Sequence, residues 1–205
     1  IDGPFQPAGR LKPGRKSGKA EAGWFAWEPD PDDFRESPID LRRLNEPHAG
    51  AHGYIRREGD RFVRGDDAPI RFRMTQAGAI LPMKPHMLEQ HTRRMAKYGI
   101  NLARFGMLGL FQAWREGDTD GFNRKLDQLH RSVASLKGNG IYVYLGHLFW
   151  DTHVRSLHDD ELPGLKEGEA ATAAMFFNEP LQQYRQQWVR NRMTPVNPYT
   201  GLTLA

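Results

Sequence analysis

The amino-acid sequence predicts an α/β fold built around a parallel sheet, and three observations support this prediction. Residues 141–145, IYVYL, are apolar along nearly their whole length, which is typical of a strand covered on both faces. Residues 84–98 and 121–137 carry apolar side chains at three- and four-residue steps, which is typical of amphipathic helices. Glycines at 99 and 138 follow these segments and favour helix termination. Because strands and helices alternate, the strands should be parallel and joined by right-handed crossovers.

The individual elements follow from these patterns. Short parallel strands are expected at residues 68–74, 100–105 and 141–146, with the two helices in the connections. A third helix is predicted at residues 180–193, where Pro180 suits the first turn. In the first helix the residues expected to face inward are Met87, Leu88, His91, Met95 and Tyr98. In the third they are Leu181, Tyr184, Trp188 and Val189.

A β-hairpin is predicted before the first parallel strand. Residues 53–64 place two β-rich runs on either side of a turn centred on Gly59. Glycine adopts the backbone conformations that such tight turns need, so the two runs can pair antiparallel.

Composition divides the chain into two parts and limits the classes of function. Of 205 residues, 39% are hydrophobic, none is cysteine, and no apolar run is long enough to span a membrane. No signal peptide is visible, and the compartment stays open, export included. The net charge of +4 comes mostly from lysines and arginines within residues 10–19, so nucleic-acid binding is disfavoured. Residues 1–36 are predicted as an irregular basic extension rich in glycine and proline, and residues 37–205 as the folded part.

Four motifs then carry a resemblance to a known family. They are GYIRREGDRFVRGDDAPIRF at 53–72, KYGINLARF at 97–105, KGNGIYVYLGHLFW at 137–150 and NPYTG at 197–201. In this order they resemble the N-terminal half of the (β/α)8-barrel retaining glycoside hydrolases, the cellulase-like and mannanase-like clan. The resemblance implies a parallel-stranded partial TIM barrel of about three βα units after a β-hairpin, with an oligo- or polysaccharide as ligand.

The resemblance also implies substrate-binding residues. Arg104 matches the arginine that these hydrolases use to hold the nucleophilic carboxylate, although a structural ion pair or a surface position would also explain it. His147 and Trp150 match residues that line the sugar site, and both could instead be ordinary packing residues. Gln76 stands near the place of the family's asparagine, where the sequence departs most from the pattern.

The catalytic carboxylates of the family would lie beyond Ala205, on strands that follow the NPYTG motif. Retaining hydrolysis needs two carboxyl groups about 5 Å apart, and no convincing pair is present in the sequence. Glu179, in the tripeptide Asn-Glu-Pro, is a candidate acid/base, but its alanine-rich context favours the first turn of a helix. Whether the chain alone is an enzyme therefore stays open.

No cofactor is predicted, and no metal site either, because the spacing of the histidines and acidic residues fixes no geometry. The residues of the right type for a metal are His147, Asp151, His153, His158, Asp159 and Asp160. An incomplete parallel sheet leaves an edge exposed, so the remainder of a barrel or a second chain is expected to cover it. The alternative function is a non-catalytic interaction protein whose basic tail contacts a partner or a polyanion.

Overall fold

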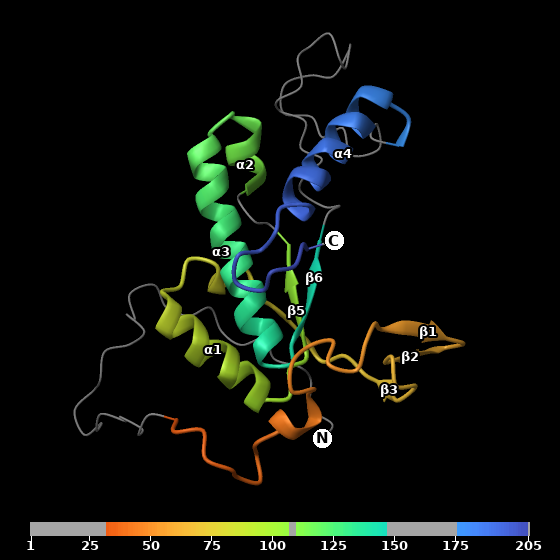
Figure 1. Ribbon diagram of the computed structural model, residues 1–205, viewed down its shortest axis with the longest axis vertical. Coiled ribbons are helices and arrows are strands. Elements are labelled where there is room, and N and C mark those ends of the chain that lie inside the picture. Colours follow the sequence, from red (N-terminus) through yellow and green to blue (C-terminus); the bar gives the residue numbers. More distant parts are fainter. Residues whose placement is uncertain (1–31, 107–109, 147–175, 205) are drawn as a thin grey trace, which may run out of the picture. The chain divides into compact units, whose positions relative to one another are not determined.

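The computed structural model of the chain describes residues 32–106, 110–146 and 176–204. The chain divides into two compact units, Ile1–Arg35 and Glu36–Ala205. All the helices and strands described here belong to the second unit. This unit is a mixed α/β structure with one antiparallel and one parallel sheet of three strands each (Figure 1).

The antiparallel sheet confirms the predicted hairpin. It contains β1 (Arg56–Glu58), β2 (Arg61–Val63) and β3 (Pro69–Ile70), in the order β1-β2-β3. Glu58 pairs with Arg61, so Gly59 and Asp60 form the two-residue loop. Gly59 has a φ of 61°, a backbone conformation that glycine adopts without a steric penalty.

The parallel sheet contains β4 (Met74–Gln76), β5 (Leu102–Phe105) and β6 (Tyr142–Leu145), in the order β4-β5-β6. The strands at 100–105 and 141–146 were therefore predicted correctly as adjacent and parallel. The first strand was placed wrongly: residues 69–70 pair with β2 in the antiparallel sheet, and the parallel strand starts only at Met74.

A buried side chain explains where the first parallel strand begins. Asn101, 9% exposed, donates from Nδ2 to the carbonyl oxygen of Arg71 (2.8 Å) and accepts the N–H of Arg73 on Oδ1 (2.7 Å). These two bonds hold the segment between the two sheets against the start of β5. The carbonyl oxygen of Arg73 also accepts the backbone N–H groups of Asn101 and Leu102, at 3.2 and 3.3 Å, so backbone contact with β5 begins immediately before β4.

Two long helices pack on one face of the parallel sheet. They are α1 (Pro85–Lys97) and α3 (Thr119–Gly138), and each precedes a strand of the sheet, as predicted. Gly99 and Gly140, with φ of 73° and 71°, turn the chain out of these helices. Asp118 caps α3 by accepting the N–H of Gly121 at 2.8 Å. Fully buried core side chains between sheet and helices include Ala103, Phe105, Leu129, Leu136 and Ile141.

The inward face of α1 differs in part from the prediction. Leu88 and Met95 are buried as expected, but Met87 and Tyr98 are 48% and 55% exposed. Thr92 is fully buried instead, and its hydroxyl lies 2.8 Å from Ser135 Oγ of α3. A threonine counts as polar in a hydrophobic pattern, yet it can be buried where a neighbouring helix supplies a hydrogen-bond partner.

Two further helices lie along the later part of the chain. The predicted third helix is α4 (Glu179–Met193), which buries Leu181 and Trp188. The short helix α2 (Leu110–Arg115) and the 3-10 turns η1 (Arg42–Leu44) and η2 (Gly78–Ile80) were not predicted. Within the described ranges, none of the helices has the length and apolar character needed to cross a membrane.

The NPYTG motif forms a turn that is fastened to α3. Asn197 is fully buried, and its Nδ2 donates to the carbonyl oxygen of His130 at 2.9 Å. Its Oδ1 accepts the N–H of Tyr199 at 2.9 Å, and the Tyr199 hydroxyl donates to Asp127 at 2.7 Å. The turn thus redirects the chain after α4, and Leu204 packs against the core.

Candidate functional site

Three side chains from neighbouring strands form a row across the parallel sheet. The strand register places Gln76 of β4 beside Arg104 of β5, and Arg104 beside Tyr144 of β6. Phe105, the next residue along β5, is fully buried under the helices. Because side chains alternate between the two faces of a strand, the row lies on the face that points away from α1 and α3.

Arg104 has the chemical features of a binding group. Its guanidinium carbon lies 5.8 Å from the centre of the Tyr144 ring. Its Nε is buried, yet no hydrogen-bond partner for it exists among the described residues, and none of them forms an ion pair with Arg104. Burying a guanidinium nitrogen without a partner is unfavourable. The group is therefore suited to donate hydrogen bonds to a carboxylate or a ligand oxygen.

The backbone beside Arg104 leaves little room for a different arrangement. Gly146 follows β6 and donates its N–H to the carbonyl oxygen of Phe105 at 2.8 Å. A side chain at Gly146 would place its first carbon 3.2 Å from this carbonyl oxygen and 4.0 Å from Arg104 Nε. The glycine thus permits the close approach of the two strand ends next to the guanidinium.

The sheet face that carries the row is open in the described part of the chain. Met74 and Tyr144 are 53% and 50% exposed there, while Leu102 is only partly exposed. The sequence predicted a third strand covered on both faces, so the exposure of Tyr144 corrects that expectation. Helices α1 and α3 cover one face, and on the other the ring of Tyr144 remains half exposed beside Arg104.

Below the row, aromatic side chains connect the parallel sheet to the hairpin. Phe72 makes an edge contact with Tyr142, with ring centres 5.8 Å apart, and Phe62 makes an equivalent contact with Phe72. The antiparallel sheet therefore packs near the amino-terminal ends of the parallel strands. The candidate site lies toward the opposite ends, where the strands finish.

The start of β6 is fixed by a buried acid. Glu46, 6% exposed, accepts a hydrogen bond from the hydroxyl of Tyr142 and another from the N–H of His52 at 3.1 Å. The Tyr142 hydroxyl in turn accepts the N–H of Gly50 at 3.1 Å. Burial and the neighbouring carboxylate raise the pKa of Tyr142 to about 12. This network attaches residues 46–52 to the sheet and leaves Tyr142 neutral at physiological pH.

The residues singled out from the sequence have different outcomes. Gln76 and Arg104 are neighbours in the row. Glu179 is an exposed residue in the first turn of α4 and accepts a hydrogen bond from Gln183 at 3.2 Å, while Asn178 caps the helix. His147 and Trp150 lie outside the described residues.

The acidic and histidine-rich segment considered above for metal binding also lies outside the described residues. Within the described ranges, no group of three or more histidine, aspartate or glutamate residues is placed to hold a metal ion.

Sequence reasoning missed Tyr144 as a member of the site. Its register with Arg104 could have revealed it, because every second residue of a strand beside Arg104 must share its face. The apolar run around Tyr144 suggested burial instead, so its role as an exposed ring was not expected.

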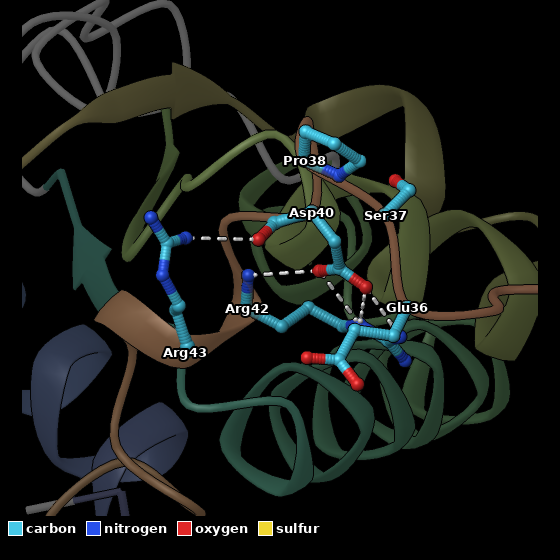
Figure 2. A pocket seen from close by; sticks show the side chains of 6 residues that line it. All are labelled: Glu36, Ser37, Pro38, Asp40, Arg42 and Arg43. Carbon is cyan, nitrogen blue, oxygen red and sulfur yellow. Dashed lines mark hydrogen bonds and ion pairs between the residues drawn. The ribbon is translucent and has the colours of Figure 1, made fainter.

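A second surface feature is a hollow near η1 (Figure 2). Figure 2 shows its lining residues, which are Glu36, Ser37, Pro38, Asp40, Arg42 and Arg43. Arg42 binds the carboxylate of Asp40 through its guanidinium and its backbone N–H, and Arg43 donates to the Asp40 carbonyl oxygen at 3.1 Å. These hydrogen bonds lower the pKa of Asp40 to about 2. The charges of Asp40 and Arg42 in the hollow therefore satisfy each other, whereas no described residue forms an ion pair with Arg104.

No protein-family model, curated protein or solved structure was found to match this chain. Function is therefore inferred from the row of side chains and from the sequence motifs.

Proposed function

We propose that the chain is part of a glycoside-hydrolase-like (β/α)8 barrel and contributes part of a carbohydrate-binding cleft. The observation that carries the proposal is the row formed by Gln76, Arg104 and Tyr144 at the ends of three parallel strands. In barrels of parallel strands, ligands bind at the end where the strands finish. The motifs that resemble the glycoside hydrolases include β5 and β6, the strands of Arg104 and Tyr144.

The row offers the types of group that a sugar ligand requires. Gln76 has an amide that both donates and accepts hydrogen bonds, and Arg104 donates to hydroxyl or carboxylate oxygens. The ring of Tyr144 presents an apolar surface that is 50% exposed, against which the C–H groups of a pyranose can pack. A small number of polar groups beside an aromatic surface is characteristic of small-molecule sites.

Hydrolysis requires further residues. Two carboxyl groups about 5 Å apart perform retaining glycoside hydrolysis, and the residues of β4, β5 and β6 that point to this face include one cation, Arg104, and no acidic residue. The proposal assigns both catalytic carboxylates to the remainder of a barrel or to a second chain. One of them would satisfy the unpaired nitrogen of Arg104, as the resemblance implies.

The open sheet face supports this assignment on physical grounds. Parallel sheets are generally covered on both faces, because their strands are apolar and each crossover helix covers only one side. Here α1 and α3 cover one face, while Met74 and Tyr144 remain about half exposed on the other. Further strands that continue the sheet around this face would cover them.

Binding of neutral oligosaccharides tests the proposal. Mannohexaose and cellohexaose would be titrated into the 205-residue chain and followed by saturation-transfer difference NMR, which detects weak binding. Arg104→Gln and Gln76→Ala should each weaken the affinity about tenfold, the equivalent of roughly 1.4 kcal/mol. The matched control is Arg57→Gln, which removes an exposed arginine from the hairpin. Binding of neither sugar, or an equal effect of the control, contradicts the proposal.

A further inference from the structure

The hollow near η1 contains one charge pair that is complete in itself. Asp40 is 8% exposed, and its carboxylate accepts hydrogen bonds from Arg42 Nε and from the Arg42 backbone N–H, each at 3.0 Å. Because the two charges neutralise each other, this pair forms a fixed and electrically neutral part of the wall. A ligand of the hollow would therefore be selected by the other lining residues, which are Glu36, Ser37, Pro38 and Arg43 (Figure 2).

Two of these lining residues, Glu36 and Arg43, are charged and exposed. Arg43 donates from Nη1 to the carbonyl oxygen of Asp40 at 3.1 Å. This bond holds the guanidinium beside the hollow and leaves its other N–H donors for a ligand. In the described part of the chain, neither Arg43 nor Glu36 takes part in an ion pair. The hollow thus offers one free cation and one free anion.

Ser37 adds a hydroxyl group whose oxygen is buried and has no hydrogen-bond partner among the described residues. A turn closed by the hydrogen bond from the Asp40 N–H to the Ser37 carbonyl oxygen, at 2.9 Å, keeps Ser37 close to the residue that holds Arg43. Serine has three staggered rotamers, so a change of rotamer would turn the hydroxyl toward the hollow. Because an unpaired buried hydroxyl is unfavourable, a ligand oxygen that accepts its hydrogen bond would gain affinity.

The size and position of the hollow are those of a separate site. Its volume is about 840 Å³, which is within the range of pockets that bind small molecules. Leu41, which stands between its lining residues in the sequence, donates its N–H to the carbonyl oxygen of Lys97 at 2.9 Å. Lys97 ends α1, and β5 starts five residues later at Leu102. The hollow therefore lies near the starting ends of the parallel strands, whereas the row lies at their finishing ends.

The charges of the lining residues define the chemical class of the ligand. Four of the six lining residues are charged, two positively and two negatively, so the hollow as a whole favours neither cations nor anions. Its free charges are one guanidinium and one carboxylate. A ligand matches both when it carries a carboxylate and an ammonium group on a small frame. Pro38 adds an apolar surface on which a ligand side chain can pack.

We propose that this hollow binds a zwitterionic α-amino acid. Arg43 and the hydroxyl of Ser37 donate hydrogen bonds to the α-carboxylate, and the carboxylate of Glu36 accepts hydrogen bonds from the α-ammonium group. The amino-acid side chain packs against Pro38. This site is additional to the proposed carbohydrate cleft and does not depend on it, because none of the residues of the row takes part.

Three probes with the same side chain separate the two charges of the ligand. L-Leucine carries both charges, L-leucinamide lacks the carboxylate, and N-acetyl-L-leucine lacks the ammonium group. Each would be titrated into the 15N-labelled 205-residue chain at about pH 6, where the amine of leucinamide is protonated, and followed by backbone amide chemical shifts. Leucine should bind at least about fivefold more tightly than either derivative, because each derivative loses one ion pair.

Substitutions in the hollow should remove these preferences one at a time. Arg43→Gln should make the affinities for leucine and leucinamide equal, and Glu36→Gln should make those for leucine and N-acetyl-leucine equal. Ser37→Ala should weaken the binding of leucine and N-acetyl-leucine and leave that of leucinamide unchanged. Glu36 and Arg43 are exposed, so the circular dichroism spectra of these two variants should match that of the wild type. The matched control is Arg57→Gln, which should change none of the affinities.

The outcomes that overturn the proposal are distinct. Equal binding of N-acetyl-leucine and leucine by the wild type would make the hollow a simple anion site, and equal binding of leucinamide and leucine would make it a simple cation site. Preferences that survive both Arg43→Gln and Glu36→Gln would place the amino acid elsewhere on the chain. Absence of binding for leucine also overturns the proposal. None of these results alters the test of the proposed function, which is read from the binding of oligosaccharides.

Discussion

The substitution Asn197→Ala tests whether the NPYTG turn holds the end of the chain on α3. The Asn197 side chain is fully buried and makes two hydrogen bonds of 2.9 Å, one to the carbonyl oxygen of His130 and one from the N–H of Tyr199. Alanine removes both and leaves the two partners without their hydrogen bond in a site with little access to water. Such losses cost about 1 to 2 kcal/mol each, so the free energy of unfolding should fall by about 2 to 4 kcal/mol.

Urea unfolding followed by circular dichroism measures this loss. With a dependence of about 2 to 3 kcal/mol per molar urea, the midpoint should fall by roughly 1 M. The matched control is Tyr199→Phe, which removes a hydroxyl bonded to Asp127 on a side chain that is 48% exposed. Exposed polar contacts contribute less than about 1 kcal/mol. A urea midpoint for Asn197→Ala that is no lower than that of Tyr199→Phe would refute the inference that this turn holds the end of the chain on α3.

Three further predictions concern buried or partly buried side chains. Burial lowers the pKa of His130, with Asp127 opposing the shift, so the protein should lose stability as the pH falls from about 6.5 toward the lower folded-state pKa. His130→Leu should reduce the loss of stability with falling pH, measured as unfolding midpoints between pH 7 and 5. An unchanged dependence of the midpoint on pH contradicts this prediction. Tyr142→Phe should lower the free energy of unfolding by about 1 to 3 kcal/mol at pH 7. It should also remove the loss of stability expected between pH 10 and 12, because the pKa of Tyr142 is raised to about 12 in the folded protein. An equal loss of stability in the wild type and the variant over this pH range argues against the prediction. Trp188→Ala should lower the free energy of unfolding by about 3 to 5 kcal/mol, and a loss below about 1 kcal/mol would mean that the buried indole does not hold α4.

The sequence predicted those elements whose apolar residues recur with the period of a strand or a helix. Strands β5 and β6 and helices α1, α3 and α4 appear close to the predicted ranges, because their buried faces follow the periods of strands and helices. Helix α2 is only six residues long, and a pattern of six residues is too short to distinguish a helix from a strand.

The misplaced first strand shows where local patterns fail. Residues 69–72 favour a strand in either sheet, and their backbone contacts include Asn101, about thirty residues away in the sequence. Its amide bonds the backbone of Arg71 and Arg73 in the segment between the two sheets. A hydrogen bond between distant residues leaves no periodic signal, so propensity alone could not place the start of β4.

The candidate site was predictable to the extent that it depends on register. In a parallel sheet, residues at matching positions of successive strands lie side by side, so the row needs only the correct alignment of β4, β5 and β6. The sequence placed Gln76 and Arg104 near the ends of their strands, and the register brings them together with Tyr144. The lack of an ion-pair partner for Arg104 among the described residues could not be predicted, because pairing depends on every side chain that surrounds the guanidinium.

The absence of an ion-pair partner for Arg104 in the described part of the chain connects the stability of the fold to its proposed function. A guanidinium with a buried, unpartnered Nε reduces the stability of the unit that contains it, whereas Asp40 and Arg42 show that this chain pairs its charges elsewhere. If Arg104 serves a ligand or a carboxylate from another part of a barrel, Arg104→Met should raise the urea midpoint of the isolated chain and abolish saccharide binding. A lowered midpoint would instead mean that Arg104 stabilises the fold through its contact with Tyr144, and the row would then be structural.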